Sequence, residues 1–445
     1  MKKLFGTDGV RGLANTELSP LLALKLGTTM AHVLIERKTK ATVLIGRDPR
    51  LSGDILESAL VAGICSQGVD AILVGVVPTP AVAFLTVQTG SAAGAVISAS
   101  HNPVKDNGIK FFGPDGYKLA DEIETAIEAQ IDSFDSFHRP SGADVGHLRH
   151  LENLARKYAD HCKSSIDHRL DGMKVVLDCS NGAASELAPM VFSELGAEVH
   201  AMHNTPNGIN INEDCGSVHA DAMRKEVVTC GAVAGLAFDG DSDRVILADE
   251  NGNIIDGDHV MAIYAVFQAA NGGLPANAVV GTVMSNIGLE IALKDRGIQL
   301  IRTPVGDRYV AEEMRLTGAI VGGEKSGHII LSRHGTTGDG IITALQILSI
   351  AHKTGKRLSE LAAIMEEFPQ ILLNVHVKDR EGWDRIPELA SAIAEAEHQL
   401  IGRGRILVRA SGTEKLIRVM AEGPDLSELE TLTEQVASVV RARLC

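Results

Sequence analysis

The feature that most constrains this chain is a structural plan that is repeated three times along it. Each copy has an apolar strand, a turn rich in Gly, Asn or Asp, a helix closed by Gly, and a second strand that ends near Pro78, Pro206 or Pro304. The copies begin at "TVLIGRDPRLSG", "KVVLDCSNGAAS" and "AVVGTVMSNIG". Uninterrupted apolar strands joined through helices predict right-handed parallel crossovers. We therefore expect three related α/β domains with parallel or mixed sheets rather than one large sheet.

The last part of the chain follows a different plan. The stretches "ILLNVHV", "GRILVRAS" and "LIRVMAE" each predict a strand, and helices are expected from about Trp383 to Leu400 and from about Leu426. This pattern predicts a smaller C-terminal α+β domain. Turn residues in "HRPSGADVG", "DENGNIIDGD" and "EEFPQ" mark the boundaries between domains. The expected domains are residues 1–150, 151–252, 253–368 and 369–445.

Composition fits this architecture and argues against several classes of protein. Only 3% of the residues are aromatic, so aliphatic side chains must build the core, as in buried parallel sheets. The net charge of −15 argues against a general role at nucleic acids or membrane surfaces. We expect neither a signal peptide nor a membrane span, because apolar runs are short throughout. The six scattered cysteines fit reduced thiols in the cytoplasm.

A compact group of carboxylates follows the apolar run "AVAGLAF". Asp239, Asp241 and Asp243 alternate within "FDGDSDR", and their charges repel one another unless water or a cation separates them. Carboxylate oxygens suit Mg²⁺, which takes few protein ligands and leaves room for phosphate or water. The segment therefore predicts a magnesium site, with an acidic turn that faces water as the alternative.

A second polar stretch, "VRASGTEKLIRV", joins two of the C-terminal strands. Arginine binds phosphate through paired hydrogen bonds, and successive amides of a glycine-containing loop form an anion-binding hollow. A phosphate site and an ordinary polar hairpin are both open at this point. The candidate phosphate-binding residues are Arg409, Ser411, Gly412, Thr413, Lys415 and Arg418.

Two further stretches combine polar side chains with glycine. In "GGEKSGH", an extended chain would place Glu324, Ser326 and His328 on one side, where they suit sugar hydroxyls and proton transfer. A purely structural role for His328 is the alternative. In "FGTDGVRG", Arg11 lies in a glycine-flanked loop, and an ion pair with Asp8 is the alternative to a functional role.

The stretch "SASHNPVKDNGIKFF" places two serines and a histidine where a strand ends. Ser98 and Ser100 would share one face of a strand, so their spacing does not choose between them. A serine hydrolase is disfavoured, because His101 is adjacent to Ser100 and is expected to point elsewhere, and because no Gly-x-Ser-x-Gly elbow is present. Together with the aspartates and the phosphate-type loop, a phosphorylated serine bound to Mg²⁺ is the better chemical interpretation.

Four of these stretches resemble, in order, the active-site loops of the α-D-phosphohexomutase family: "ISASHNPVKDNGIKFF", "FDGDSDR", "GGEKSGH" and "RASGTEKLIRV". The resemblance runs essentially from end to end and gives one loop to each expected domain. "FGTDGVRG", the form "SASHNP" and the chain length are most similar to the bacterial branch that interconverts glucosamine 6-phosphate and glucosamine 1-phosphate on the way to UDP-N-acetylglucosamine. A mutase of neutral sugar phosphates, a metal-dependent sugar phosphatase and a silent sugar-phosphate-binding regulator are the alternatives.

The resemblance also implies a cofactor, ligands and a role for each candidate residue. Mg²⁺ would be the cofactor, glucosamine or glucose 1,6-bisphosphate the activator, sugar phosphates the partners, and a homodimer the assembly to consider. By position, the resemblance assigns the phosphoserine to Ser100; metal binding to Ser100, Asp239, Asp241 and Asp243; sugar binding to Glu324 and Ser326; phosphate binding to Arg409, Ser411, Gly412, Thr413 and Arg418; proton transfer to Lys110 and His328; and stabilisation of the transferring phosphoryl group to Arg11 and Arg244.

Two positions depart from the family pattern. Lys325 stands where the family has a neutral residue, often Gln, and Lys415 stands where it has Pro. Lys415 would add positive charge to the phosphate loop. Because it holds an alternate position, Lys325 is expected to point away from Glu324 and Ser326. An inward ammonium would oppose the ammonium of glucosamine and weaken the substrate assignment.

Overall fold

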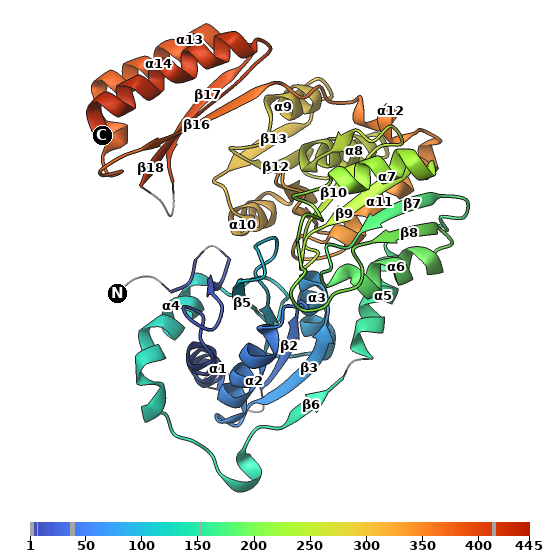
Figure 1. The fold of residues 1–445 in the computed structure, drawn as a ribbon, viewed down its shortest axis with the longest axis vertical. Helices are drawn as coiled ribbons and strands as arrows, with labels where there is room; N and C mark the ends of the chain where they lie inside the picture. The colour runs from blue at the N-terminus through green and yellow to red at the C-terminus, as the bar shows by residue number, and fades with distance from the viewer. Residues whose placement is uncertain (1–3, 7, 36–40, 152, 412–414) are drawn as a thin grey trace. The chain divides into compact units, whose positions relative to one another are not determined.

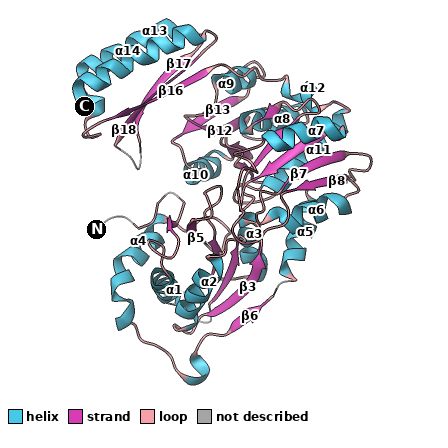
Figure 2. Cartoon of the chain, in the orientation of Figure 1, coloured by secondary structure: helices cyan, strands magenta, loops and turns pink. Residues whose placement is uncertain are grey.

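The computed structural model describes residues 4–6, 8–35, 41–151, 153–411 and 415–445 (Figure 1). The chain divides into two units. The large unit comprises Met1–Met284 and Leu300–Ile364, and the small unit comprises Ser285–Gln299 and Met365–Cys445. Figure 2 shows helices and strands alternating along most of the large unit.

The first part of the large unit is an α/β domain with a mixed six-stranded sheet. Its elements are β1 (Val10–Leu13), α1 (Pro20–Ile35), β2 (Thr42–Arg47), α2 (Gly53–Cys65), β3 (Asp70–Val76), α3 (Thr79–Thr89), β4 (Ala93–Ile97), β5 (Asp106–Phe112), α4 (Asp121–Gln130), two 3₁₀ helices (Ile131–Ser136 and Gly142–Asp144) and β6 (Leu148–His150). The strand order is β1-β5-β4-β2-β3-β6. β2 pairs in parallel with β3 and β4, whereas β5 runs antiparallel to β4 and β1. Aliphatic residues of α1, α2 and the sheet form the core.

The second domain repeats this plan around a five-stranded sheet. Its elements are α5 (Leu154–Ser164), β7 (Lys174–Asp178), α6 (Ala184–Glu194), β8 (Glu198–Met202), α7 (Asp221–Cys230), β9 (Ala234–Phe238), β10 (Val245–Ala248) and β11 (Ile254–Ile255). The strand order is β11-β10-β9-β7-β8. β7 is parallel to β8 and β9, so their carboxyl ends lie at one edge, where the loop after β9 carries the aspartates.

The third domain has a four-stranded sheet in the order β13-β12-β14-β15. Its elements are α8 (Gly257–Ala270), β12 (Ala278–Thr282), β13 (Gln299–Thr303), α10 (Asp307–Thr317), β14 (Val321–Gly323), β15 (Ile329–Leu331), α11 (Gly340–Thr354) and α12 (Leu358–Ala362). β14 pairs in parallel with β12 and antiparallel with β15. The turn between β14 and β15 carries the segment "EKSG".

The small unit contains a three-stranded antiparallel sheet. Its elements are α9 (Ile287–Lys294), β16 (Gln370–His376), a 3₁₀ helix (Trp383–Arg385), α13 (Pro387–Leu400), β17 (Arg405–Ala410), β18 (Leu416–Glu422) and α14 (Leu426–Leu444). The strand order is β16-β18-β17. Figure 2 shows α13 and α14 along one face of this sheet, and their aliphatic side chains join the strands in one core.

The predicted fold class is confirmed. The three repeated segments correspond to β2–α2–β3, β7–α6–β8 and β12–α9–β13, and the C-terminal part is a separate α+β arrangement. The domain limits at residues 150, 252 and 368 stay a prediction. Within the described residues, no helix has the length and apolar character needed to cross a bilayer.

A buried helix cap in the large unit makes stability depend on pH. Asp339 caps α11 by accepting from the Ile342 N–H at 2.9 Å, and it also accepts from the Tyr158 hydroxyl at 2.9 Å. Burial raises the pKa of Asp339 to about 6. Because this folded-state pKa lies above the unfolded value of about 4, the free energy of unfolding falls as pH rises from about 4 to 6, by up to roughly 3 kcal/mol.

We expect Asp339→Asn to remove this part of the pH dependence, because the amide keeps the cap oxygen and cannot ionise. Urea unfolding from about pH 4 to pH 8 would measure it. Asp221→Asn is the control, since that carboxyl at the start of α7 is 83% exposed. An unchanged pH slope in Asp339→Asn, or an equal change in the control, would contradict the assignment.

Candidate active site

Ser100 follows β4 in a tight loop and is fully buried. Its φ of 54° is left-handed, a conformation that non-glycine residues keep only when their surroundings impose it. Its Oγ donates to Asp239 Oδ2 at 2.5 Å. Ser98 differs: its Oγ donates to Asp48 Oδ2 at 2.6 Å and accepts from the Ser100 N–H at 2.9 Å. Ser100 therefore faces the aspartates, and Ser98 supports its backbone.

The three aspartates of "FDGDSDR" come together after β9. Each offers one carboxylate oxygen, and these oxygens lie within 4.8 Å of one another. All three side chains are buried, so the alternative of an acidic turn that faces water is wrong. Oδ1 of Asp241 and Oδ1 of Asp243 have no hydrogen-bond partner among the described residues. Buried carboxylates with unused oxygens fit a hard divalent cation.

The pKa values of these aspartates are shifted because the carboxylates are buried close to one another and to Lys110. Burial, reinforced by the charges of Asp243 and Asp241, raises the pKa of Asp239 well above its usual value. For Asp241, burial alone would raise the pKa, but Lys110 and a hydrogen bond from Thr79 outweigh it and lower the pKa. The protein's own groups thus neutralise only part of the negative charge of the aspartate cluster. A bound cation would neutralise the rest.

Lys110 of β5 lies inside the acidic cluster. Its Nζ lies 3.1 Å from Asp241 Oδ2, 3.6 Å from Asp243 Oδ2 and 3.2 Å from Asp8 Oδ2. Burial would lower the pKa of Lys110, but these carboxylates overcome burial and raise it. The side chain is therefore an ammonium in this state, able to donate a proton but not to accept one.

The "GGEKSGH" segment forms a tight turn, so the condition under which Glu324, Ser326 and His328 would share one side is not met. The Glu324 N–H donates to the His328 carbonyl at 3.0 Å, and the Gly327 N–H donates to the Glu324 carbonyl at 3.0 Å. Ser326 is consequently exposed while His328 is buried. Gly327 permits the reversal with a φ of 91°, and a Cβ there would lie 2.3 Å from the Val245 carbonyl oxygen.

His328 ends a row of ionisable side chains that the sequence did not reveal. Its Nε2 lies 3.7 Å from Asp307 Oδ2 and 3.9 Å from Asp243 Oδ2. Lys118 Nζ lies 2.5 Å from Asp307 Oδ2 and 2.8 Å from Asp8 Oδ1. Lys118, Asp307 and His328 line a cavity of about 320 Å³ between the first and third domains. This cavity provides space for a small polar ligand beside Asp307 and His328.

Arg244 and Arg11 are also placed among acidic side chains. The Arg244 N–H donates to Asp239 Oδ1 at 3.2 Å, and its Nε lies 3.7 Å from Asp243 Oδ1. Burial opposes the charge of Arg244, but Asp243 and Asp239 outweigh burial and raise its pKa. Arg11 forms an ion pair with Asp8, as the alternative interpretation of that loop predicted.

The expectation that His101 points away from Ser100 is wrong. His101 Nδ1 lies 3.3 Å from Ser100 Oγ. The left-handed φ of Ser100 breaks the alternation of an extended strand, so that two successive side chains lie on the same side. Burial and the charges of Arg244 and Arg11 lower the pKa of His101 to about 4. The imidazole beside Ser100 is therefore neutral at physiological pH.

The small unit carries the candidate phosphate-binding residues. Arg409 of β17 and Arg418 of β18 are directly paired across the sheet. Burial and the charge of Arg418 lower the pKa of Arg409. Ser411 is buried, and its N–H donates to the Leu416 carbonyl at 2.8 Å. Gly412 and Thr413 lie outside the described residues, and Lys415 is exposed.

Lys325 interacts with the start of α8. Its Nζ lies 3.7 Å from Oδ2 of Asp256, the N-cap residue of that helix. Glu324, in contrast, accepts from the Gly306 N–H through Oε1 at 3.1 Å. The two neighbouring side chains therefore have different partners.

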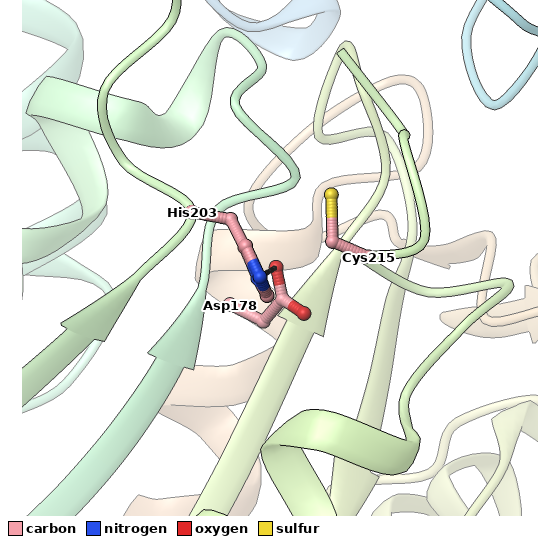
Figure 3. Close-up of side chains that lie close together, drawn as sticks. All are labelled: Asp178, His203 and Cys215. Carbon is pink, nitrogen blue, oxygen red and sulfur yellow. Dashed lines mark ion pairs between the residues drawn. The ribbon is translucent and has the colours of Figure 1, made fainter. Parts of the chain in front are cut away.

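A second cluster, formed by Asp178, His203 and Cys215, lies in the second domain (Figure 3). Asp178 Oδ1 lies 3.1 Å from His203 Nδ1. The two oxygens of Asp178 also accept from the backbone N–H groups of Ser180 and Gly216, each at 2.9 Å. Burial and the charge of Asp178 raise the pKa of Cys215 to about 12, so it remains a thiol. Since both carboxylate oxygens already accept hydrogen bonds, the cluster ties two loops together as a structural element.

Comparison with known proteins finds family models and relatives that match along most of the chain. Four family models match in order: phosphoglucomutase/phosphomannomutase alpha/beta/alpha domain I over residues 2–137, domain II over 156–252, domain III over 256–368, and the C-terminal domain over 372–439. The phosphoglucosamine mutase of Desulforamulus reducens is 53% identical over 99% of both chains. The phosphoglucosamine mutase of Moorella thermoacetica is 54% identical over 97% of this chain and 98% of its own.

Solved structures agree with the fold. A phosphoglucomutase/phosphomannomutase family protein from Burkholderia thailandensis superposes with a TM-score of 0.83 at 22% identity, covering 99% of this chain and 98% of that one. The N-acetylphosphoglucosamine mutase of Aspergillus fumigatus, in complex with GlcNAc-6P and magnesium, gives a TM-score of 0.68 at 18% identity, covering 99% and 95%.

The chain belongs to the phosphoglucomutase/phosphomannomutase family, and it is an intramolecular phosphotransferase of the isomerase class. The predicted resemblance to the α-D-phosphohexomutases is thereby confirmed. Within the family, the chain groups with the proteins named phosphoglucosamine mutase, which match it over nearly their full length.

Proposed function

We propose that this chain interconverts glucosamine 6-phosphate and glucosamine 1-phosphate through a phosphoserine at Ser100 and a 1,6-bisphosphate intermediate. The observation that carries the proposal is the hydrogen bond of 2.5 Å between Ser100 Oγ and Asp239 Oδ2, within a buried aspartate cluster. The choice of amino sugar rests on relatives named phosphoglucosamine mutase that are about half identical over the full chain.

The proposed metal ligands are Asp239, Asp241, Asp243 and the phosphate on Ser100. Their fit to Mg²⁺ is supported by the two buried carboxylate oxygens that lack hydrogen-bond partners among the described residues. Mg²⁺ would neutralise charge on the transferring phosphoryl group when bound. The proposed activator is glucosamine or glucose 1,6-bisphosphate; a protein of related fold, a serine-to-alanine variant of the Aspergillus fumigatus mutase, was solved in complex with the latter.

In the forward half of the reaction, the bond between phosphorus and Ser100 Oγ breaks while a bond forms to the free hydroxyl of the sugar. The hydroxyl proton leaves to a base, a role we assign to His328, and the departing Ser100 Oγ takes a proton from the ammonium of Lys110. Arg11 and Arg244 would hold the transferring group in line by their positive charge. The bisphosphate then turns over, and its other phosphoryl group returns to Ser100.

The remaining assignments concern substrate binding. Glu324 and Ser326 are proposed to bind sugar hydroxyls. The direct pairing of Arg409 with Arg418 favours an anion, because a bound phosphate would relieve the repulsion between the two guanidinium groups. The proposed ligands of the phosphate that does not react are Arg409, Ser411, Gly412, Thr413 and Arg418.

The cellular role follows from this activity. The product would feed UDP-N-acetylglucosamine synthesis and hence amino-sugar metabolism in the cytoplasm. Six free cysteines in the structure fit a reducing compartment. A homodimer stays a prediction.

The test is a comparison of kcat/KM for glucosamine 1-phosphate, glucose 1-phosphate and mannose 1-phosphate, each with Mg²⁺ and the matching 1,6-bisphosphate. We expect at least a roughly tenfold preference for glucosamine 1-phosphate, lost in Ser100→Ala. Equal or better use of the neutral sugars would move the protein to the phosphomannomutase/phosphoglucomutase branch. Stoichiometric release of inorganic phosphate would identify a phosphatase instead.

A further inference from the structure

Arg50 is a buried cation to which the reaction described above gives no role. It follows β2 in the segment "GRDPRLSG", and its side chain is 0% exposed. A buried guanidinium is costly unless each of its N–H groups finds an acceptor. The acceptors of Arg50 therefore indicate what the residue does.

Three of the four backbone carbonyls that accept from Arg50 belong to the loop that carries Ser100, and the fourth belongs to Asp106, the first residue of β5. Nη2 donates to the carbonyls of Ser100 at 3.0 Å and Asn102 at 2.7 Å. Nη1 donates to the carbonyls of Pro103 at 2.6 Å and Asp106 at 3.2 Å. The loop is thus folded around a single guanidinium group.

Through its Nε, Arg50 is also linked to the backbone N–H of Ser100 by a chain of hydrogen bonds. Nε donates to Asp48 Oδ2 at 2.9 Å, and this oxygen also accepts from Ser98 Oγ at 2.6 Å. Ser98 Oγ in turn accepts from the Ser100 N–H at 2.9 Å. The buried pair of Arg50 and Asp48 therefore fixes Ser100 at both its carbonyl and its N–H.

Asn212, from the second domain, reinforces the same loop. Its Nδ2 donates to the Ser100 carbonyl at 2.9 Å and to the Asn102 carbonyl at 3.1 Å. Each of these two carbonyl oxygens thus accepts one hydrogen bond from Arg50 and one from Asn212. Both lone pairs of each oxygen are therefore used. Two domains hold the loop through shared acceptors.

We propose that Arg50 is a positioning residue for phosphoryl transfer. It maintains the left-handed φ of 54° at Ser100, which directs Oγ to the metal-binding aspartates. It also draws carbonyl oxygens toward itself, so that these oxygens do not face a phosphate on Ser100 and repel it. The inference rests on the proposed function only in requiring that Ser100 carries the phosphoryl group, and it does not depend on which sugar is used.

The test compares Arg50→Lys, which keeps the charge but lacks the fork of donors, with Asn212→Ala, which leaves Arg50 and its contacts in place. Misplacing a reacting group by about 1 Å costs on the order of 100-fold. We therefore expect Arg50→Lys to lower kcat about 100-fold, with the KM for sugar phosphate changed less than about threefold. Asn212→Ala should lower kcat by about tenfold, again with little change in KM.

A second readout separates positioning from folding. Wild type and variants are incubated with glucose 1,6-bisphosphate, and phosphate on Ser100 is followed over time by intact-mass spectrometry. We expect phosphorylation of Ser100 to slow in proportion to kcat in both variants, while circular dichroism shows folded protein. If Arg50→Lys does not fold, Asp48→Asn, which alters the acceptor of Arg50 Nε, takes its place in both measurements.

The outcomes are distinguishable. A normal kcat and a normal rate of Ser100 phosphorylation in the folded variants, with only a lower Tm, would overturn the positioning role and leave the proposed function intact. A rise in KM with kcat unchanged would likewise overturn it and assign the residues to substrate binding. Wild-type protein that takes no phosphate on Ser100 would overturn both the proposed function and this inference.

Discussion

Ser100→Ala is expected to reduce mutase turnover by at least roughly 10⁴-fold, the scale found when a covalent nucleophile is removed. The reason is geometric. Ser100 Oγ lies 2.5 Å from Asp239 Oδ2, whereas Ser98 Oγ is turned to Asp48 at 2.6 Å. The neighbouring serine is therefore not placed to carry the phosphoryl group in its stead. A coupled assay of glucose 6-phosphate or glucosamine 6-phosphate formation measures turnover, and intact mass measures incorporated phosphate.

Ser98→Ala is the matched control for this prediction. It removes a hydroxyl two residues away, and with it the acceptor of the Ser100 N–H at 2.9 Å. We expect a loss of about tenfold in kcat, with phosphate still found on Ser100. Phosphate on Ser98 in the Ser100→Ala variant, or turnover above about 1% of wild type, would show that Ser100 is not the acceptor.

Asp239→Asn is expected to have two opposite effects. Without metal it should raise Tm, because burial and the charges of Asp243 and Asp241 raise the pKa of Asp239. A raised pKa means that stability is lost as pH rises through it, so a neutral amide avoids this loss near pH 7. The same change removes a proposed metal ligand, and we expect kcat/KM to fall by about 10²–10³-fold.

Thermal unfolding over a range of MgCl₂ concentrations checks the prediction. Wild type should gain Tm with Mg²⁺, because an ion that binds only the native state stabilises it, and Asp239→Asn should gain little. Asp178→Asn is the control, since this buried aspartate pairs with His203 at 3.1 Å in the separate structural cluster. The control should have a lower Tm at every Mg²⁺ concentration and a normal response. A normal Mg²⁺ response in Asp239→Asn would exclude it as a ligand.

The repeated sequence pattern predicted the layers of the fold, whereas the meeting of Ser100 with the aspartates was implied by the resemblance to the phosphohexomutases. Continuous apolar strands separated by helices required parallel pairing, and parallel strands bring their carboxyl ends to one edge. The loops after β4 and β9 belong to different sheets, so their meeting depends on how the two domains pack. The two loops meet at the buried hydrogen bond between Ser100 and Asp239.

Other parts of the site depended on features without a sequence signal. The turn at Gly327 and the position of His101 both arise from positive φ angles, of 91° at Gly327 and 54° at Ser100. Strand alternation does not hold across such residues. The prediction that His101 points away from Ser100 therefore failed, and the conditional placement of Glu324, Ser326 and His328 on one side does not apply. The approach of Lys118 to Asp307, at 2.5 Å, joins side chains that are far apart in the sequence and depends on how two domains pack. For Arg50, the Asp-x-Arg spacing after a buried strand was a usable signal that the sequence analysis did not exploit.

The ammonium of Lys110, 3.1 Å from Asp241 and 3.6 Å from Asp243, bears on how the enzyme is made as well as on how it works. A newly synthesised chain carries this counterion within its own sequence, so the aspartate loop can fold before any metal arrives. If the aspartates bind magnesium as proposed, the ion would complete a site that is already shaped, and we expect folding not to depend on its local supply. Depletion of magnesium should accordingly yield an inactive but folded protein that regains activity when the ion returns.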